Sequence, residues 1–181
     1  MRMSPSLDLL DIAKLESGRL MSVPERLVLP ALTSSIVSEM EPQPITKGHT
    51  MDVRFDPAAH PIFADPQLLR QVVTNLLSNA IKYTPDGGRI AIDVEQHNGS
   101  ITWAVCDNGV GVPRAALPKL FEKFYRAGNA VSIEAEGTGL GLHLVRLIVE
   151  QAGRVWCESE EGRGATFAFT LPTIVEQGDR R

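Results

Sequence analysis

Polar side chains recur at helical spacing between apolar pairs near the middle of the chain. They are Gln71, Asn75, Asn79 and Lys82, and their steps of four, four and three residues place them on one side of a helix. An amide oxygen is a hard ligand that suits Mg²⁺, and a lysine one turn further on supplies a point charge for phosphates. The stripe predicts a site for a metal and phosphates; the alternative is the solvent face of an amphipathic helix.

A carboxylate and two glycines follow a predicted strand in the segment DNGVG, residues 107–111. The Asp107 carboxylate can accept a hydrogen bond from an exocyclic amine such as that of adenine. Gly109 and Gly111 lack the Cβ atom that would keep the backbone away from a flat base. A turn without any ligand has the same composition, so this segment alone leaves both interpretations open.

Three glycines at positions 137, 139 and 141 open a predicted helix directly after a long irregular segment. Glycines at a helix N-terminus expose unpaired N–H groups and the positive end of the helix dipole to a phosphate. The segment is not a P-loop, because no Gly-Lys-Ser/Thr follows it. It is not a dinucleotide fingerprint either, because the three-residue step between glycines is missing.

The segment FEKFYR, residues 121–126, lies inside the irregular stretch that precedes these glycines. Phe121 and Phe124 can pin a lid when it closes, and Lys123 or Arg126 can reach a terminal phosphate. The alternative is a surface helical turn with one apolar side.

The elements that must position these residues follow from periodicity and turn signals. We expect helices at 6–20 (the end of a longer helix), 27–40, 65–83 and 139–152, and a loop at 41–49. We expect strands at 50–55, 89–95, 100–106, 155–158 and 165–171, with Asn98-Gly99 as a hairpin connection. Residues 112–136 lack a period and exceed the ~12–15 residues of an idle connection, which predicts a lid or a disordered loop. Helices that alternate with hairpin-connected strands predict an α+β sandwich, a sheet covered on one face by helices.

The composition of the 181 residues, 43% hydrophobic and 22% charged, is that of an ordinary globular domain. Lys and Arg number 18 against 22 Asp and Glu, a net charge of −4, so there is no basic field for nucleic acid or anionic lipid. No apolar run approaches the ~20 residues that cross a bilayer, and we expect a soluble piece. Cys106 and Cys157 match no metal spacing, and we expect both to be buried cytosolic thiols.

The order of five segments resembles that of the catalytic ATP-binding domain of bacterial sensor histidine kinases. NLLSNAIKYT, DNGVG, FEKFYR, GTGLGL and GRGATF resemble its asparagine box, first glycine box, phenylalanine box, second glycine box and terminal strand motif. The resemblance implies the Bergerat ATP-binding fold of the GHKL superfamily, a two-layer α/β sandwich with a mixed, largely antiparallel sheet and a flexible ATP lid. It divides the chain into the end of the dimerisation and phosphoacceptor helix (1–20), the catalytic domain (21–173, lid about 112–137) and a polar tail (174–181).

The resemblance implies ATP and Mg²⁺ as cofactors and assigns roles to individual residues. Asn79 would be the Mg²⁺ ligand, with Asn75 beside it, and the catalytic residues would be Asn75, Asn79, Lys82 and Arg126. Asp107 would hold the adenine amine. The other nucleotide contacts would come from Lys82, Tyr83, Gly109, Gly111, Val112, Lys123, Phe124, Gly137, Thr138, Gly139, Leu140, Gly141, Leu142 and Thr166. Thr166 would lie beside Asp107, although Ala165 occupies a position where the family often has Ser or Thr.

The same fold serves ATPases that activate water, and these resemble one another in placing a Glu one helical turn before the metal-binding Asn. Asn75 stands there in this chain, and an amide has no usable basicity. Phosphoryl transfer to a histidine does not need that base, because a neutral imidazole is already a nucleophile. The kinase is therefore favoured over a water-using ATPase or an anti-sigma serine kinase. A non-catalytic ATP-binding interaction module stays open as an alternative.

The acceptor histidine of the family, followed by an acidic residue near Arg-Thr-Pro, has no counterpart at His49, His60, His97 or His143. We therefore expect a donor module that does not label itself. The implied partners are ATP, the dimerisation and phosphoacceptor domain and a response-regulator receiver domain, with no nucleic acid. The resemblance also implies a homodimeric parent kinase, a fragment that can be monomeric, and a cytoplasmic location, with the inner membrane as an anchor for the parent.

Overall fold

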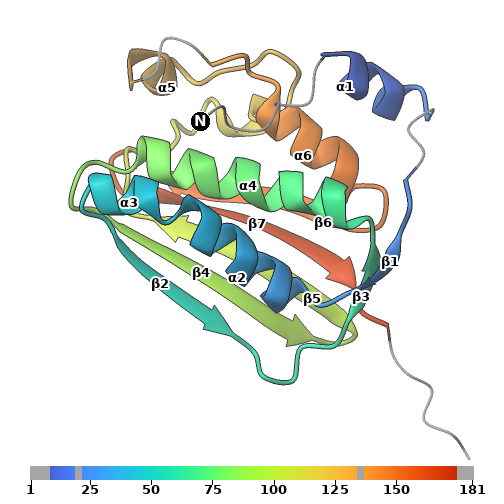
Figure 1. Cartoon of the computed structure of the whole chain (residues 1–181). Coiled ribbons are helices and arrows are strands. Elements are labelled where there is room, and N and C mark those ends of the chain that lie inside the picture. Colours follow the sequence, from blue (N-terminus) through green and yellow to red (C-terminus); the bar gives the residue numbers. More distant parts are fainter. Residues whose placement is uncertain (1–8, 19–21, 134–136, 175–181) are drawn as a thin grey trace, which may run out of the picture.

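A mixed five-stranded sheet with helices on one face dominates the computed structural model of the chain (Figure 1). The structure describes residues 9–18, 22–133 and 137–174. The strands lie side by side in the order β2 (Thr50–Phe55), β4 (Arg89–His97), β5 (Ser100–Asp107), β7 (Gly164–Pro172) and β6 (Arg154–Glu160). The pair β2–β4 is parallel and the other pairs are antiparallel. The predicted α+β sandwich with a mixed, largely antiparallel sheet is confirmed.

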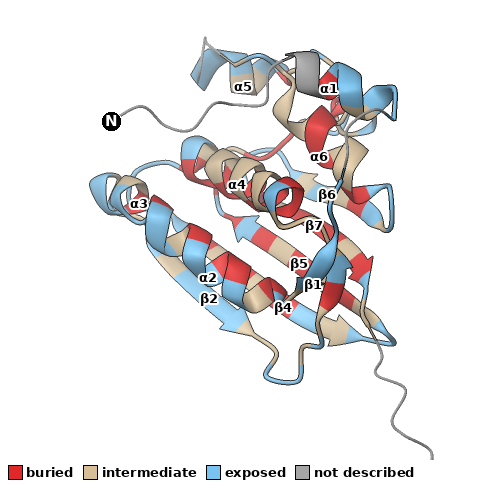
Figure 2. Cartoon of the chain, turned by 45° about the vertical axis from the view of Figure 1, so that its right-hand side comes forward, coloured by how far each residue is buried: buried red, intermediate tan, exposed pale blue. Residues whose placement is uncertain are grey.

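Helices α2 (Leu29–Met40), α4 (Pro66–Tyr83) and α6 (Gly141–Val149) lie over the same face of the sheet (Figure 1). Helix α4 begins at Asp65, whose side chain accepts hydrogen bonds from the N–H groups of Gln67 and Leu68, with a proline at the first helical position. The helix predicted at 65–83 is thus confirmed. Figure 2 shows that the buried side of the helices faces the sheet.

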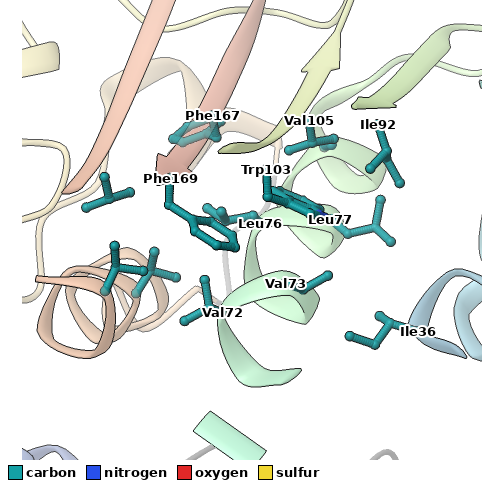
Figure 3. Close-up of a cluster of buried hydrophobic side chains, with 14 of the residues drawn as sticks. Ile36, Val72, Val73, Leu76, Leu77, Ile92, Trp103, Val105, Phe167 and Phe169 are labelled. Carbon is teal, nitrogen blue, oxygen red and sulfur yellow. The ribbon is translucent and has the colours of Figure 1, made fainter. Parts of the chain in front are cut away.

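The core between the two layers fixes the orientation of α4. Trp103 of β5 stacks on Phe169 of β7 with ring centroids 5.5 Å apart, and its indole N–H donates to the Thr33 hydroxyl of α2 at 3.1 Å. The apolar pairs of α4 pack against these rings (Figure 3). They include the fully buried residues Val72, Val73, Leu76 and Leu77. Because these pairs face the sheet, the polar stripe of α4 is turned toward the remaining elements.

Those remaining elements lie at one end of the sandwich. The segment after β5 contains a short 3₁₀ turn, η1 (Leu117–Lys119), and α5 (Gly128–Ile133), so the stretch expected to be irregular has two short helical pieces. Helix α1 (Leu9–Glu16) lies beside α6 (Figure 1), within the range 6–20 that was expected to be helical. Residues 6–8, 19 and 20 of that range, and almost all of the polar tail, are outside the described residues.

Besides η1 and α5, the short elements β1, β3 and α3 were not predicted. Strands β1 (Glu25–Leu27) and β3 (Ile62–Ala64) form a separate antiparallel pair, and three residues are too few for an alternating pattern to stand out. The segment 41–49 contains the helix α3 (Pro42–Thr46), because a proline is tolerated in the first turn of a helix. In the described part of the chain, no helix is long and apolar enough to cross a membrane.

The hairpin was predicted correctly and the thiols only in part. Asn98 and Gly99 both have positive φ, 49° and 77°, as the connection between β4 and β5 requires. The expectation that both cysteines are buried was wrong, because Cys106 is exposed. It points to the uncovered face of the sheet, where strand alternation puts it opposite to buried Val105. Cys157 is half-buried, and burial raises the pKa of its thiol to about 12.

Candidate functional site

A cavity of about 1010 Å³ opens between α4, α6, the segment after β5 and the end of the sheet. Most of the predicted site residues line it. They are Asn75, Asn79, Lys82, Tyr83, Asp107, Gly111, Val112, Arg126, Gly137, Thr138, Gly139, Leu140, Gly141 and Leu142. Four predicted residues, Gly109, Lys123, Phe124 and Thr166, do not line it. The structure therefore brings together the polar stripe, the buried carboxylate and the glycine-rich helix start, which are far apart in the sequence.

The polar stripe of α4 forms one wall of the cavity and is not a solvent face. Its residues Gln71, Asn75, Asn79 and Lys82 all line the cavity. A Cβ atom at Gly141, the first residue of α6, would lie 3.0 Å from the Asn75 amide oxygen, so the two helices meet at this point. The Gln71 amide oxygen is buried and accepts no hydrogen bond from the described residues. Amide side chains therefore line the cavity beside the start of α6, and the amide oxygen of Gln71 has no partner among the described residues.

Asp107 ends β5 and is the buried carboxylate of the site, with 8% of its surface exposed. One carboxylate oxygen accepts the Gly109 N–H at 2.8 Å. Burial raises the pKa of Asp107, and hydrogen bonds from the backbone of Gly109 and Ala165 offset part of that rise. A carboxylate has about four lone-pair sites, so acceptor capacity remains for a donor in the cavity.

The glycines after Asp107 are needed for contacts within the protein itself. A Cβ atom at Gly109 would collide with the carbonyl oxygen of Tyr83, the last residue of α4. Gly111 has φ +64°, and a Cβ atom there would collide with the carbonyl oxygen of Glu160. Close approach to a flat base was the predicted reason for these glycines. The structure gives a second reason for them: the segment 107–111 packs directly on the backbone at Tyr83 and at Glu160, where a side chain would not fit.

The segment 121–126 is attached to the fold through one of its two phenylalanines. Phe121 packs edge-on against Phe167 of β7, with centroids 6.5 Å apart, whereas Phe124 is 60% exposed. Phe124 has φ 64°, and its N–H donates to the Gly139 carbonyl oxygen at 3.0 Å. The aromatic segment and the glycine segment that were predicted separately are therefore joined through their backbones.

The two cations of this segment are placed differently. The Arg126 guanidinium lies against Gly137, where an added Cβ atom would be 2.9 Å from its Cζ, and Arg126 lines the cavity. The Lys123 ammonium instead donates to both carboxylate oxygens of Glu16 in α1, at 2.9 and 3.0 Å. In this conformation Arg126 is positioned to meet an anion in the cavity and Lys123 is not.

Glu16 also accepts from His143 of α6, a residue for which the sequence predicts no functional role. The His143 Nε2 lies 3.0 Å from a Glu16 oxygen, and its Nδ1 lies 3.3 Å from the Phe121 carbonyl oxygen. Hydrogen bonds from Lys123 and His143 lower the pKa of Glu16. No spacing links these residues, since they come from α1, the 121–126 segment and α6, and only the fold brings them together.

Thr166 was expected to lie beside Asp107 in the site, but it does not line the cavity. Ala165 and Phe167 of β7 line the cavity, and Thr166 between them does not. Side chains alternate along a strand, so Thr166 lies on the same face as Cys106, with which it is paired in register. The wall beside Asp107 is therefore apolar at this position.

Comparison with known families matches residues 64–174 to the family described as histidine kinase-, DNA gyrase B-, and HSP90-like ATPase. The chain is 37% identical over 177 residues to the adaptive-response sensory kinase SasA of Synechococcus sp. (strain CC9902), covering 96% of this chain and 45% of SasA. It is 40% identical over 118 residues to the sensor histidine kinase WalK of Bacillus subtilis (strain 168), covering 64% of this chain and 19% of WalK. The chain thus spans less than half the length of these relatives.

Solved structures with bound nucleotide and without it share the fold. Full-length ShkA in complex with AMPPNP has a TM-score of 0.80 at 26% identity, covering 93% of this chain and 35% of ShkA. The nucleotide-free catalytic domain of the histidine kinase ThkA has a TM-score of 0.73 at 27% identity, covering 83% of this chain and 96% of that structure. The chain therefore belongs to the histidine kinase-, DNA gyrase B- and HSP90-like ATPase family and contains the catalytic ATP-binding domain of a two-component sensor histidine kinase.

Proposed function

We propose that the chain binds Mg-ATP in the cavity between α4 and α6 and donates the γ-phosphoryl group to a histidine on a dimerisation and phosphoacceptor domain. The proposal rests on one observation, which is that three groups line the same cavity. These are the buried Asp107 carboxylate, the amides of Asn75 and Asn79, and the glycine-rich start of α6. They can supply an acceptor for a base amine, oxygen ligands for a metal and N–H donors for phosphates.

The base end of the proposed site is Asp107, which accepts the exocyclic amine of adenine. Val112 lines the cavity on this side, as do the apolar side chains of Ala165 and Phe167. Apolar walls around one convergent polar group are the usual construction of a small-molecule site. We do not assign a nucleotide contact to Thr166, because its side chain is turned to the other face of the sheet.

The phosphate end is formed by α4, α6 and the segment after β5. None of the described side chains caps the N-terminus of α6, which leaves its first N–H groups for phosphate oxygens in this proposal. Lys82 and Arg126 add positive charge from two other sides, and Tyr83 and Thr138 complete the wall. The nucleotide is thus held by local N–H groups and a few cations, which is compatible with a net charge of −4.

The residues present fit Mg²⁺ held jointly with phosphates. The described residues contain no cluster of three or more His, Cys, Asp or Glu that could form an all-protein metal cage. Mg²⁺ usually keeps several waters and takes one or two protein ligands besides phosphate oxygens, and the Asn79 amide oxygen in the cavity suits that role. When bound, the ion would neutralise charge on the phosphates.

Catalysis in this proposal is positioning and charge neutralisation. The bond between the γ-phosphorus and the β,γ-bridging oxygen breaks, a bond to an imidazole nitrogen of the acceptor forms, and ADP leaves. Lys82, Arg126 and the N–H groups of α6 hold the charged oxygens while this happens. Asn75 stands where water-using relatives of this fold place a general base, and its amide does not activate water.

The acceptor is proposed to lie on another segment of the kinase or on the partner domain. Of the four histidines, His143 is buried and bonded to Glu16, and His49 lies against the carbonyl oxygens of Thr84 and Pro85. His60 and His97 are exposed in surroundings unlike the acceptor motif. We further propose a receiver domain of a response regulator as the final phosphoryl acceptor, a homodimeric parent kinase and action in the cytoplasm.

Incubation with γ-labelled Mg-ATP and a separate acceptor-helix domain tests the proposal. Label should appear on the acceptor, depend on Mg²⁺, and be absent from this chain. Asn79→Ala should abolish the transfer, while Arg54→Met, on the far face of the sheet, serves as the matched control. ATP binding without transfer would support the non-catalytic binding module instead, and steady phosphate release by the isolated chain would support an ATPase.

A further inference from the structure

The loop between α3 and β2 makes an unusual set of contacts with the end of α4. The Lys47 ammonium donates to three main-chain carbonyl oxygens, those of Ile81 at 3.0 Å, Lys82 at 3.2 Å and Thr84 at 3.4 Å. A lysine ammonium has three N–H donors, so these three acceptors use its full capacity. Lys47 is therefore a cation placed on the C-terminus of the helix that carries the polar stripe.

The position of the Lys47 ammonium suits the C-terminal end of a helix, where carbonyl groups lack partners. The last four carbonyl groups of an α-helix lack partners within the helix and carry the negative end of its dipole. A cation that hydrogen-bonds to them satisfies both the acceptors and the dipole. Thr84 follows Tyr83 in an extended conformation, so the chain leaves the helix at this point and Lys47 covers the carbonyls that would face water.

His49 and the backbone of the same loop reinforce the contact. The His49 Nε2 lies 3.3 Å from the Thr84 carbonyl oxygen and 3.1 Å from that of Pro85, and two acceptors require that Nε2 carries a hydrogen. The Gly87 N–H donates to the Lys47 carbonyl oxygen, and the Thr50 N–H to that of Gly88, both at 2.9 Å. The loop 47–50 is thus fixed to the turn 84–88 along its length.

The other side of this turn is the segment that carries the base-binding carboxylate. The Val110 N–H donates to the Tyr83 carbonyl oxygen at 3.2 Å, and the Arg89 N–H donates to the Asn108 side chain at 2.7 Å. The end of α4 is held on one side by the loop 47–50 and on the other by the segment 107–111. Its position sets the distance between the phosphate end of the site and the base end.

We propose that Lys47 is a positioning residue for ATP binding, and that it acts by fixing the last turn of α4, which presents Lys82 and Tyr83 to the phosphates. The inference rests on the proposed function, in which these two residues face the phosphates and Asp107 holds the base. Without the cation, the last turn frays and the phosphate contacts lose their fixed geometry. The base end does not change, because Asp107 is held by the pairing of β5 with β4, in which it lies opposite Ile90.

This mechanism predicts a loss of affinity that depends on the ligand's phosphates. Lys47→Met should weaken Mg-ATP binding about 10-fold while the affinity for adenosine stays within about twofold of the parent chain. A variant that merely loses global stability shows no such selectivity when binding is measured well below its unfolding temperature. Lys47→Arg keeps a cation on the carbonyls and should restore ATP affinity to within about threefold.

The experiment measures Mg-ATP binding by calorimetry and adenosine binding by NMR titration, with amide hydrogen exchange of residues 80–84 as a local readout. Arg54→Met, an exposed cation on the far face of the sheet, is the matched control and should leave all three unchanged. Selective loss of ATP affinity with faster exchange at 80–84 supports the inference. Unchanged ATP affinity, or an equal loss for adenosine, overturns it.

Lys82→Met, measured in parallel, separates this inference from the proposed function. If Lys82→Met leaves ATP affinity unchanged, the phosphate role of Lys82 is wrong. If it weakens ATP binding and Lys47→Met does not, the positioning role of Lys47 alone is wrong. Should Lys47→Met fail to fold, Lys47→Gln keeps an uncharged donor at the helix end, and the same selective or unselective result decides.

Discussion

Replacing Asp107 by asparagine tests the base end of the cavity. The carboxylate is 8% exposed and accepts the Gly109 N–H at 2.8 Å, with acceptor capacity left for an adenine amine. An amide in its place turns an NH₂ donor toward that amine and removes the charge. Hydrogen bonds to charged groups contribute about 1.5–3 kcal/mol, which corresponds to a loss of about 10- to 150-fold in ATP affinity.

The same substitution should not weaken the fold. Burial raises the pKa of Asp107, so the folded chain holds this proton more tightly than the unfolded chain does. The free energy of unfolding therefore falls as the pH rises between the ordinary and the raised pKa, and the ionised carboxylate costs stability at neutral pH. The nucleotide-free Asp107→Asn variant should unfold at a temperature equal to or above that of the parent chain at pH 7.

Calorimetric titration with Mg-ATP and thermal unfolding without nucleotide, each from pH 7 down to pH 5, measure both effects. ATP affinity of the parent chain should decrease as the pH falls toward the raised pKa and Asp107 takes up its proton, and Asp107→Asn should lack this component. Asp93→Asn, the partner of Arg54 on the far face, is the control. ATP affinity of Asp107→Asn within about twofold of the parent, or identical pH profiles, would refute the assigned role.

Four further substitutions, at Gly164, Gly162, Phe169 and Glu16, test packing and the contact with α1. Gly164 has φ +96° and an added Cβ would collide with the Asp107 carbonyl oxygen, so Gly164→Ala should lower the free energy of unfolding in urea by about 2–4 kcal/mol. Gly162, at φ +80° with open space around it, should lose only about 1–2 kcal/mol, and equal losses would contradict the packing argument. Phe169→Ala should cost about 3–5 kcal/mol and shift the tryptophan emission, since Phe169 is fully buried against Trp103; an unchanged emission would count against this contact. Glu16→Gln should release Lys123 and strengthen Mg-ATP binding by about two- to fivefold at low salt. The lowered pKa of Glu16 means that its contact with Lys123 is complete above the ordinary pKa and is lost as the pH falls through the lowered one, so the variant and the parent should converge in acid.

Long elements with strong local signals could be predicted from the sequence. Asp65-Pro66 and apolar pairs four residues apart predict helix α4. The structure confirms where this helix starts and places its polar stripe in the wall of the cavity. Short elements could not, because β1 and β3 have three residues each and depend on pairing with one another. The position of Thr166 outside the cavity could have been predicted, since Phe167 and Phe169 are apolar and strand alternation places Ala165, not Thr166, on their side.

Contacts between distant segments were beyond the reach of the sequence. Glu16 meets Lys123 and His143 across 107 and 127 residues, and neither spacing nor residue type indicates that they come together. The same holds for Lys47, which lies 34 residues from the first carbonyl group it binds. Local patterns report which side of an element is buried, whereas these contacts depend on how the elements are stacked.

The parallel pairing of β2 with β4 has a consequence for the order of assembly. The connection between β2 and its parallel partner β4 contains β3 and α4, whereas β4 and β5 are joined by a two-residue turn. Closing a long connection costs more chain entropy than closing a short one, so we expect the β4–β5 hairpin to form early and the β2–β4 pair late. Helix α4, which carries the polar stripe, lies in the connection between β2 and β4. We therefore expect its position on the sheet to be fixed only when β2 has paired with β4. A chain that is still folding therefore has no complete nucleotide site. Because ATP binds only the folded chain, we expect it to shift the equilibrium of the last folding step toward the folded state by mass action.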